Sequence, residues 1–279
     1  MSALAIIGGS GLYEIDGGKL VKEHELETPY GRPSDKILEV EFSKNTVFFL
    51  PRHGKGHTLN PSEINYRANI YALKSLGVRF IVSVSAVGSL KEEYHPNHVV
   101  LPSQFMDWTK SKRPRTFFED GIVGHVSNAN PVFTPLRNIV AESLKACDIV
   151  HTLAGTYICI EGPQFSTRAE SSYYRQMGMD IVGMTNVPEA FLAKEAAIGY
   201  TTMAMVTDYD AWKDEHCTVE EIMKVMAVNK VNAKKVLMDF IPRFYDSKLD
   251  YIKENEFSII SAQEGLSAEK KSIIETLLR

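Results

Sequence analysis

Residues 80–89 read FIVSVSAVGS, an apolar run rich in β-branched residues that passes into small and hydroxyl-bearing ones. Such a run is typical of a strand that is buried on both faces of a sheet. In open α/β sheets, ligands bind beyond the carboxyl ends of the strands. The hydroxyls of Ser83, Ser85 and Ser89 therefore mark a candidate site, although a structural strand-to-loop transition accounts for the same residues.

Further apolar runs of strand length alternate with helical patterns on both sides of this stretch. Strands are expected at residues 3–7, 37–42, 46–50, 98–101, 156–160, 180–184 and 200–206. Helices are expected at residues 62–76, 136–147, 168–177, 188–198 and 219–240. Ser62 is the expected N-cap of the first helix, and Gly77 its stop. This alternation predicts an α/β fold around a central sheet.

The chain has 279 residues and shows no internal repeat, low-complexity tract or Gly/Ser linker. We therefore expect one domain over residues 1–279. Residues 246–279 are charged and end in a helical pattern at residues 268–278. That segment is expected to be either a late helix or a tail that contacts a partner.

The composition is ordinary for a soluble globular enzyme, with 44% hydrophobic and 24% charged residues and a net charge of −4. It gives no sign of a surface for nucleic acid or membrane, and no run approaches the roughly 18 apolar residues of a membrane span. Cys147, Cys159 and Cys217 are odd in number and widely spaced, so neither a disulfide framework nor a CxxC metal pair is expected. A reduced, cytosolic compartment fits this cysteine usage.

Two expected strand ends carry possible anion donors. The turn Gly8-Gly9-Ser10-Gly11 brings backbone N–H groups and a hydroxyl together, but it lacks the third glycine of a dinucleotide fingerprint. Pro51-Arg52-His53-Gly54 offers a guanidinium fork suited to phosphate oxygens and a further donor in His53. A plain tight turn and a basic surface turn explain these segments equally. His53 and His57 are not expected to bind metal, since glycines between them disfavour a helix.

Three later junctions carry groups suited to a sugar and a base. In residues 161–168, Phe165 can stack on a flat ligand or belong to the core, and Glu161 and Arg168 can form a structural ion pair. In residues 183–189, Thr185 can donate to an anion and Met184 can contact a sugar ring.

The third junction, residues 207–212, follows an apolar strand and carries two carboxylates. Asp208 and Asp210 point the same way in an extended segment, and such a pair suits proton donation or recognition of a base edge. Capping of the next turn is the structural alternative. All the junctions together supply phosphate donors, a hydrophobic surface and a carboxylate pair, which fits phosphorolysis of a nucleoside.

At this point the sequence resembles the trimeric branch of the purine nucleoside phosphorylase family, in particular its members that act on 5'-methylthioadenosine. The resemblance spans residues 3–244 and rests on motifs that occur in the family's order: IGGSGL (7–12), PRHG (51–54), NYRAN (65–69), SAVGSL (85–90), EGPQFS (161–166), MTNVPEA (184–190) and TDYD (207–210). It implies a single domain with a twisted central mixed sheet flanked by helices, a homotrimer, no metal and no organic cofactor. Inorganic phosphate would be the co-substrate.

The resemblance also implies a role for each matching residue. Phosphate would be bound by Ser10, Arg52, His53, Ser85, the backbone of Ala86 and Thr185. The nucleoside would be contacted by Met184 at the ribose, Phe165 at the base, Asp208 and Asp210 at the purine N7 and 6-amino edge, Val219, Ile222 and Met223 at the methylthio group, and His125 of a neighbouring subunit. Asp208 and Asp210 are the catalytic candidates.

Some positions depart from the family pattern. Ser10 and Ser85 stand where animal members usually carry threonine, which keeps the hydroxyl. Gly183 stands where some members carry asparagine, so a ribose contact there is not expected. Family members that act on 6-oxopurines resemble one another in carrying asparagine at the position of Asp208. The resemblance therefore implies that the carboxyl group of Asp208 favours a 6-amino purine. Phosphorolysis of adenosine, inosine, guanosine or methylthioinosine remains the alternative, with a non-catalytic nucleoside- or phosphate-binding protein as the alternative of another class.

Overall fold

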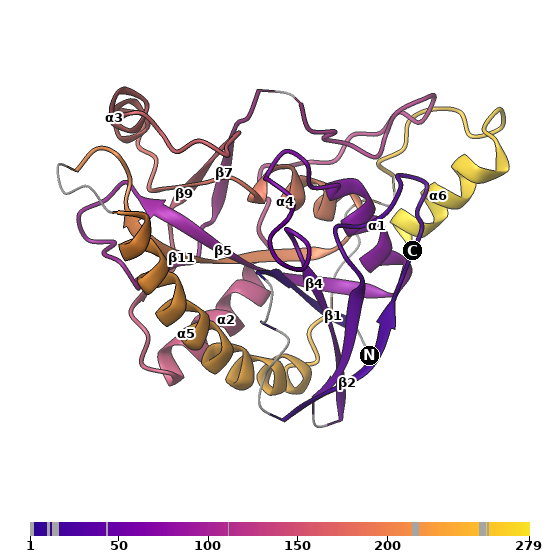
Figure 1. The fold of residues 1–279 in the computed structure, drawn as a ribbon. Helices are drawn as coiled ribbons and strands as arrows, with labels where there is room; N and C mark the ends of the chain where they lie inside the picture. The colour runs from indigo at the N-terminus through magenta and orange to yellow at the C-terminus, as the bar shows by residue number, and fades with distance from the viewer. Residues whose placement is uncertain are drawn as a thin grey trace.

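A computed structural model describes residues 3–9, 12, 17–42, 44–110, 112–213, 218–250, 255 and 257–279, with the side chain of Val219 excepted. The chain folds as one mixed sheet with helices on both faces (Figure 1). The strands are β1 (Ala3–Gly8), β2 (Gly18–His24), β3 (Ile37–Phe42), β4 (Asn45–Pro51), β5 (Val78–Ser89), β6 (Val99–Val100), β7 (Gln104–Trp108), β8 (His151–Thr152), β9 (Thr156–Ile160), β10 (Ile181–Gly183) and β11 (Gly199–Tyr209). The helices are α1 (Tyr66–Ser75), α2 (Thr134–Ala146), α3 (Arg168–Gln176), α4 (Asn186–Glu195), α5 (Val219–Asp246) and α6 (Ala268–Leu278).

The long strand β5 is the hub of the sheet. The main order is β2-β3-β4-β1-β5-β10-β9-β7, and β11 also pairs with β5 along its length. The strands β4, β1, β5 and β11 run parallel, so their carboxyl ends lie at one edge of the sheet. The end of β5 additionally pairs with β10, which is antiparallel to it. This branching brings the ends of β5, β10 and β11 together.

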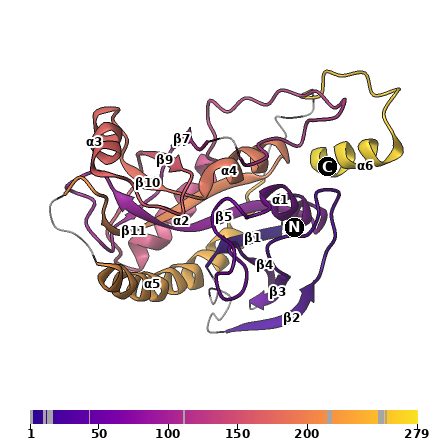
Figure 2. The same ribbon diagram turned by 45° about the horizontal axis from the view of Figure 1, so that its top comes forward.

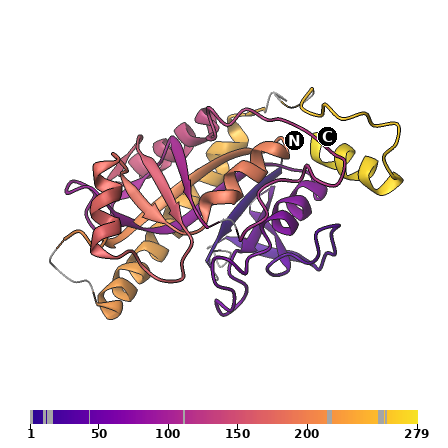
Figure 3. The same cartoon turned by 90° about the horizontal axis from the view of Figure 1, so that it is seen from above.

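Helices cover the two faces of the sheet in separate groups. α2 and α5 pack against each other and against β11 on one face, while α1 and α4 pack together on the other (Figure 2). Viewed from above, α6 lies at the opposite end of the molecule from α3 (Figure 3). α6 packs on α1, and its Ile273 and Leu277 are buried in the same apolar cluster as Ile70. The C-terminal segment is thus a late helix attached to this core.

Most expected elements occur close to their predicted positions, and the α/β fold with a central mixed sheet is confirmed. The N-cap expectation is wrong, because Asn65 caps α1 by accepting from the Ala68 N–H, and the helix begins at Tyr66. The Ser62 hydroxyl instead bonds to Glu161. The sequence reading missed β2 and β7, whose residues are mostly exposed or half-buried and so lack a clean apolar run. It also ended α5 six residues early, before Pro242, which the helix tolerates.

Candidate active site

Arg52 follows β4 and turns its guanidinium into the protein, below the ends of β1 and β5. The residue is 2% exposed. Its Nε and Nη2 donate to the two carboxylate oxygens of Glu189 at 2.7 and 2.9 Å. Nη1 donates to the Val84 carbonyl at 3.0 Å, and Nη2 to the Ser83 hydroxyl at 2.5 Å. Burial opposes the positive charge, but Glu189 outweighs burial and raises the pKa of Arg52.

Glu189 was not among the expected site residues, although it lies in the MTNVPEA motif. Its Oε1 also accepts from the Tyr200 hydroxyl at 2.8 Å, and the Asn186 amide donates to Tyr200 at 2.6 Å. A buried polar network therefore fixes Arg52 from β11 and α4. Paired in this way, the Arg52 and Glu189 charges are held rigidly, whereas a buried unpaired charge is costly. The sequence signal for this network was a glutamate near the start of a helix, followed by the apolar run Ala190–Ala193.

A backbone carbonyl fixes the orientation of the His53 ring. Its Nδ1 donates to the Leu59 carbonyl at 2.9 Å, because a carbonyl can only accept. Burial lowers the pKa of His53 to about 4, and the charge of Arg52 acts in the same direction. The neutral ring then carries no proton on Nε2. The neutral His53 ring thus offers an acceptor at Nε2, which differs from the expected donor and suits a protonated phosphate oxygen. The His57 ring stacks on the His53 ring, with 4.1 Å between the ring centroids.

Ser85 and Thr185 meet although they lie on different strand ends. Their hydroxyl oxygens are 3.5 Å apart, and the Ser85 hydroxyl is 3.4 Å from the Ala86 carbonyl. Both distances are at the outer limit of hydrogen bonding, so neither hydroxyl is strongly engaged. Ala86 is exposed next to these two buried residues. The structure thus brings together three of the six expected phosphate contacts, Ser85, Ala86 and Thr185. Arg52 and His53 follow the neighbouring strand β4, and Ser10 lies outside the described residues.

Arg113 is a second buried arginine that the sequence reading missed. It is 3% exposed and donates to the carbonyls of Met184, Val187 and Glu161 at 2.6, 2.9 and 2.6 Å. It also forms an ion pair with the Glu161 carboxylate at 3.7 Å. Arg113 thereby fixes the segment that carries Met184. No helical or strand pattern surrounds it in sequence, so nothing local distinguished it from a surface arginine.

Asp208 and Asp210 lie at the end of β11, beside the end of β5. A bulge separates Val206 from Asp208, and the Asp210 N–H donates to the Ser89 carbonyl at 3.0 Å. Gly88 of β5 permits this approach, since a Cβ there would lie 3.2 Å from Cβ of Asp210. The structural alternative, capping of the next turn, is not seen for Asp208, whose Oδ1 accepts from the Thr207 hydroxyl at 2.6 Å.

Burial raises the pKa of both carboxyl groups. For Asp208 the Thr207 hydroxyl acts in the opposite direction, and the charge of Asp210 raises the pKa further. Asp210 is 6% exposed, and its Oδ2 has no hydrogen-bond partner among the described residues. Ser166 and Ser171 lie beside it and lower its pKa. Oδ2 of Asp210 is therefore a buried acceptor beside two serine hydroxyls.

The remaining nucleoside candidates occupy more open positions. Phe165 is 67% exposed and Met184 is half-buried. Ile222 and Met223 lie near the start of α5, which begins near the tips of β5 and β11 (Figure 1). Val219 begins that helix, but its side chain lies outside the described residues. Exposed apolar groups gathered at a strand edge are typical of a surface that binds a ligand.

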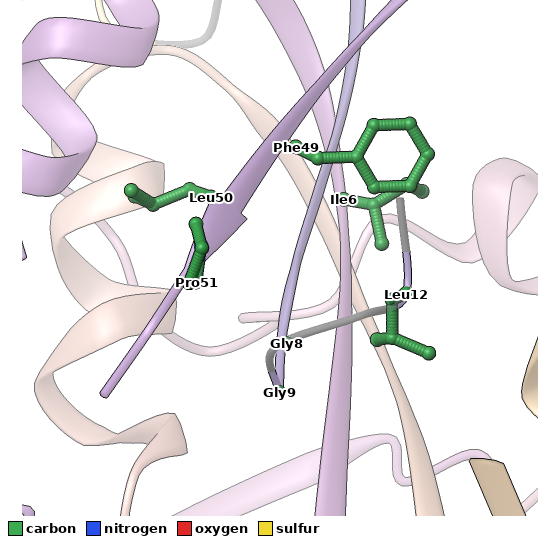
Figure 4. A pocket seen from close by; sticks show the side chains of 7 residues that line it. All are labelled: Ile6, Gly8, Gly9, Leu12, Phe49, Leu50 and Pro51. Carbon is green, nitrogen blue, oxygen red and sulfur yellow. The ribbon is translucent and has the colours of Figure 1, made fainter. Parts of the chain in front are cut away.

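A small apolar recess adjoins the first glycine turn. It lies between the ends of β1 and β4 and is lined by Ile6, Gly8, Gly9, Leu12, Phe49, Leu50 and Pro51 (Figure 4). Its lining includes no polar side chain, so it is packing space beside the site and not a ligand pocket. Among the residues that the structure describes, no cluster of histidine, cysteine and carboxylate side chains could bind a metal ion, and no helix could span a membrane.

Comparison with known proteins places this site in a family. The family model described as "Phosphorylase superfamily" matches residues 3–242. The chain belongs to the phosphorylase superfamily. Over 241 residues it is 52% identical to an S-methyl-5'-thioadenosine phosphorylase of Hyperthermus butylicus, covering 86% of this chain and 88% of the relative.

Solved structures resemble this phosphorylase over its whole length. A methylthioadenosine phosphorylase from an antarctic soil metagenomic library is 46% identical, with a TM-score of 0.94 and coverage of 100% of this chain and 99% of the other. A methylthioadenosine phosphorylase of Schistosoma mansoni, in complex with adenine, is 33% identical, with a TM-score of 0.84 and coverage of 100% and 99%. The expected family is therefore confirmed, and the likeness extends over the C-terminal segment.

His125 of this phosphorylase lies apart from the strand ends. It is exposed, and its N–H donates to the Ser258 carbonyl at 2.9 Å, beside the bridge between Gly124 and Ile259. In the single chain it therefore packs with the C-terminal segment and does not join the other candidate residues.

Proposed function

We propose that the protein catalyses the reaction of 5'-methylthioadenosine with inorganic phosphate to give adenine and 5-methylthioribose 1-phosphate. The observation that carries this proposal is the pair of buried carboxyl groups, Asp208 and Asp210, at the same sheet edge as the hydroxyls of Ser85 and Thr185. The names of the relatives in the superfamily support the same activity. The reaction belongs to methionine and purine salvage.

The chemistry needs charge support at both ends of the breaking bond. As C1'–N9 breaks, the ribose becomes positive and the purine negative. A phosphate oxygen bound near Ser85, Thr185 and the Ala86 backbone forms the new bond to C1' from the opposite face. Asp208 in its protonated form donates to N7, and the electron pair of the C1'–N9 bond stays on the purine. Burial favours the protonated form of the carboxyl group, as this role requires.

Selectivity for the base follows from the same carboxyl groups. The 6-amino group of adenine is a donor, and the buried Oδ2 of Asp210 is an acceptor. A 6-oxopurine would instead place its 6-oxygen, an acceptor, against the carboxylate oxygens. Neither group would then have a hydrogen-bond donor, which is costly in a buried site. At the other end of the nucleoside, Ile222 and Met223 give the start of α5 an apolar surface that suits a methylthio group better than a 5'-hydroxyl.

A substrate panel tests the proposal. Methylthioadenosine, adenosine, methylthioinosine and inosine are each incubated with and without phosphate, and base release is measured. We expect phosphate-dependent release of adenine from methylthioadenosine at the highest kcat/KM. A preference for inosine would favour the 6-oxopurine alternative, and binding with no turnover of any nucleoside would favour a binding protein.

We further propose a cytoplasmic homotrimer that uses no metal or organic cofactor, has phosphate as co-substrate, and binds neither nucleic acid nor membrane. The position of His125, remote from the site of its own chain, supports a site completed by a neighbouring subunit. The buried thiols Cys147 and Cys159 are free, which suits a reducing compartment; Cys217 lies outside the described residues.

A further inference from the structure

The Tyr157 hydroxyl is buried behind the candidate phosphate site with an unused donor. Tyr157 lies on β9, is 0% exposed and packs its ring edge-on against Phe105. Its hydroxyl has no hydrogen-bond partner within the part of the chain that the structure describes. Native proteins rarely leave a buried hydroxyl unsatisfied, so such a group calls for an explanation.

The missing side chain of Gly183 creates the space for this hydroxyl. A Cβ on Gly183 would overlap the Tyr157 hydroxyl oxygen and lie 2.5 Å from Cζ. Gly183 directly precedes Met184 and Thr185, so the hydroxyl sits beneath the backbone that leads into the site. Space, and not an unusual backbone angle, therefore requires glycine at this position.

The neighbours of the hydroxyl are the phosphate candidates themselves. Thr185 follows Gly183, which contacts the Tyr157 hydroxyl, by two residues, and the Thr185 hydroxyl is 3.5 Å from that of Ser85. In line with this geometry, Ser85 and the backbone of Thr185 act to lower the pKa of Tyr157, although burial dominates and raises it. Ser85 is engaged only at 3.4 and 3.5 Å by its other partners. A hydroxyl that accepts a hydrogen bond from behind keeps its own proton for a ligand in front, and such chains of donors strengthen one another.

We propose that Tyr157 is a positioning residue of the phosphate site: its hydroxyl donates to Oγ of Ser85, so that Ser85 directs its own proton at a phosphate oxygen. This inference rests on the proposed function, since it assigns inorganic phosphate to the site around Ser85 and Thr185. Tyr157 does not touch phosphate. It acts through Ser85, and Gly183 provides the room for it to do so.

The test is calorimetric titration of inorganic phosphate into the whole protein. Tyr157→Phe removes only the hydroxyl. The matched control is Tyr71→Phe, because Tyr71 is also buried but lies on α1, where its ring packs against that of Tyr30. We expect Tyr157→Phe to weaken phosphate binding by about three- to tenfold, the usual worth of one neutral hydrogen bond. The KM for the nucleoside should change by less than about twofold, because Tyr157 does not touch the nucleoside. The melting temperature should fall only slightly, since a single neutral hydrogen bond to Ser85 is lost.

A double-mutant cycle separates this role from simple packing. If Tyr157 acts through Ser85, Tyr157→Phe should have no further effect on phosphate binding in a Ser85→Ala background. Gly183→Ala should displace the hydroxyl and weaken phosphate binding at least as much. Unchanged phosphate affinity in Tyr157→Phe, or additive losses in the cycle, would overturn the inference. Because the titration needs no turnover, a protein that binds phosphate but cleaves no nucleoside refutes the proposed function alone.

Discussion

Arg52 and Glu189 form a two-point ion pair, with Nε to Oε2 at 2.7 Å and Nη2 to Oε1 at 2.9 Å, and both side chains are at most 3% exposed. The pair joins the end of β4 to α4 across 137 positions of sequence. An arginine held in this way has a fixed direction and little freedom to follow a ligand. Its hydrogen bonds to Ile7, Val84 and Glu189 hold the strand ends in place.

Replacement of Arg52 should therefore affect both folding and phosphate use. Arg52→Ala leaves Glu189 buried without its partner, and we expect a loss of about 3–5 kcal/mol in unfolding free energy. The phosphate KM should also rise strongly. Arg52→Ala/Glu189→Gln removes the orphan charge, so it should recover stability but not phosphate affinity. Urea unfolding and phosphate saturation measure the two effects; normal phosphate saturation in the double variant would remove Arg52 from the phosphate site.

Asp208→Asn should impair catalysis and change base preference. The amide keeps the size of the side chain but cannot act as an acid. Activity on methylthioadenosine should fall by about 10²-fold or more, mainly in kcat, because N7 support matters most as the purine leaves. Activity on inosine should fall much less. The assay is steady-state kinetics on both substrates; near-normal kcat on methylthioadenosine contradicts the acid role, and equal losses contradict the base-reading role.

Glu195 should make stability depend on pH. It lies at the end of α4 and accepts from the Phe117 N–H at 2.7 Å and the Thr116 hydroxyl at 2.8 Å, yet burial raises its pKa to about 7. A carboxyl group with a raised folded-state pKa binds more protons in the folded than in the unfolded protein. The stabilisation that Glu195 adds to the folded protein is therefore full below about pH 4.5, and it is lost as the pH rises to about 7.

Comparison with Glu195→Gln isolates this group. Relative to the variant, the wild type should lose about 3 kcal/mol of unfolding free energy between pH 4.5 and 7. Urea unfolding at several pH values and one fixed protein concentration measures the difference. If the unfolding free energies of the wild type and Glu195→Gln differ by the same amount from pH 4.5 to 7, Glu195 titrates near its ordinary pKa.

The proposed trimer predicts a site shared between subunits. His125→Ala should raise the nucleoside KM while leaving phosphate affinity and the folded state of the single chain nearly unchanged, because His125 is exposed in that chain. Light scattering of the wild type should report three chains. A stable and fully active monomer would exclude both the trimer and the role of His125.

The sequence by itself determined the strand and helix pattern, because burial on both faces of a sheet requires apolar runs that are visible locally. β9 and α6 have the predicted bounds, and the polar groups at the strand ends were found for the same reason. It could not show the exposed β2, whose residues carry no such run. Local pattern therefore reports whether a segment is buried, but not what a polar side chain meets there.

Only the tertiary structure decided which polar side chains contact one another. Arg52 with Glu189, Arg113 with the Met184 carbonyl, and the Tyr157 hydroxyl beside Gly183 each join residues far apart in sequence or on different strands. Such pairings depend on the order and register in which β5, β10 and β11 associate, and no local propensity encodes that order. The inward direction of Arg52 and the acceptor face of His53 have the same origin: a buried polar group must satisfy its hydrogen bonds with whatever the fold places beside it.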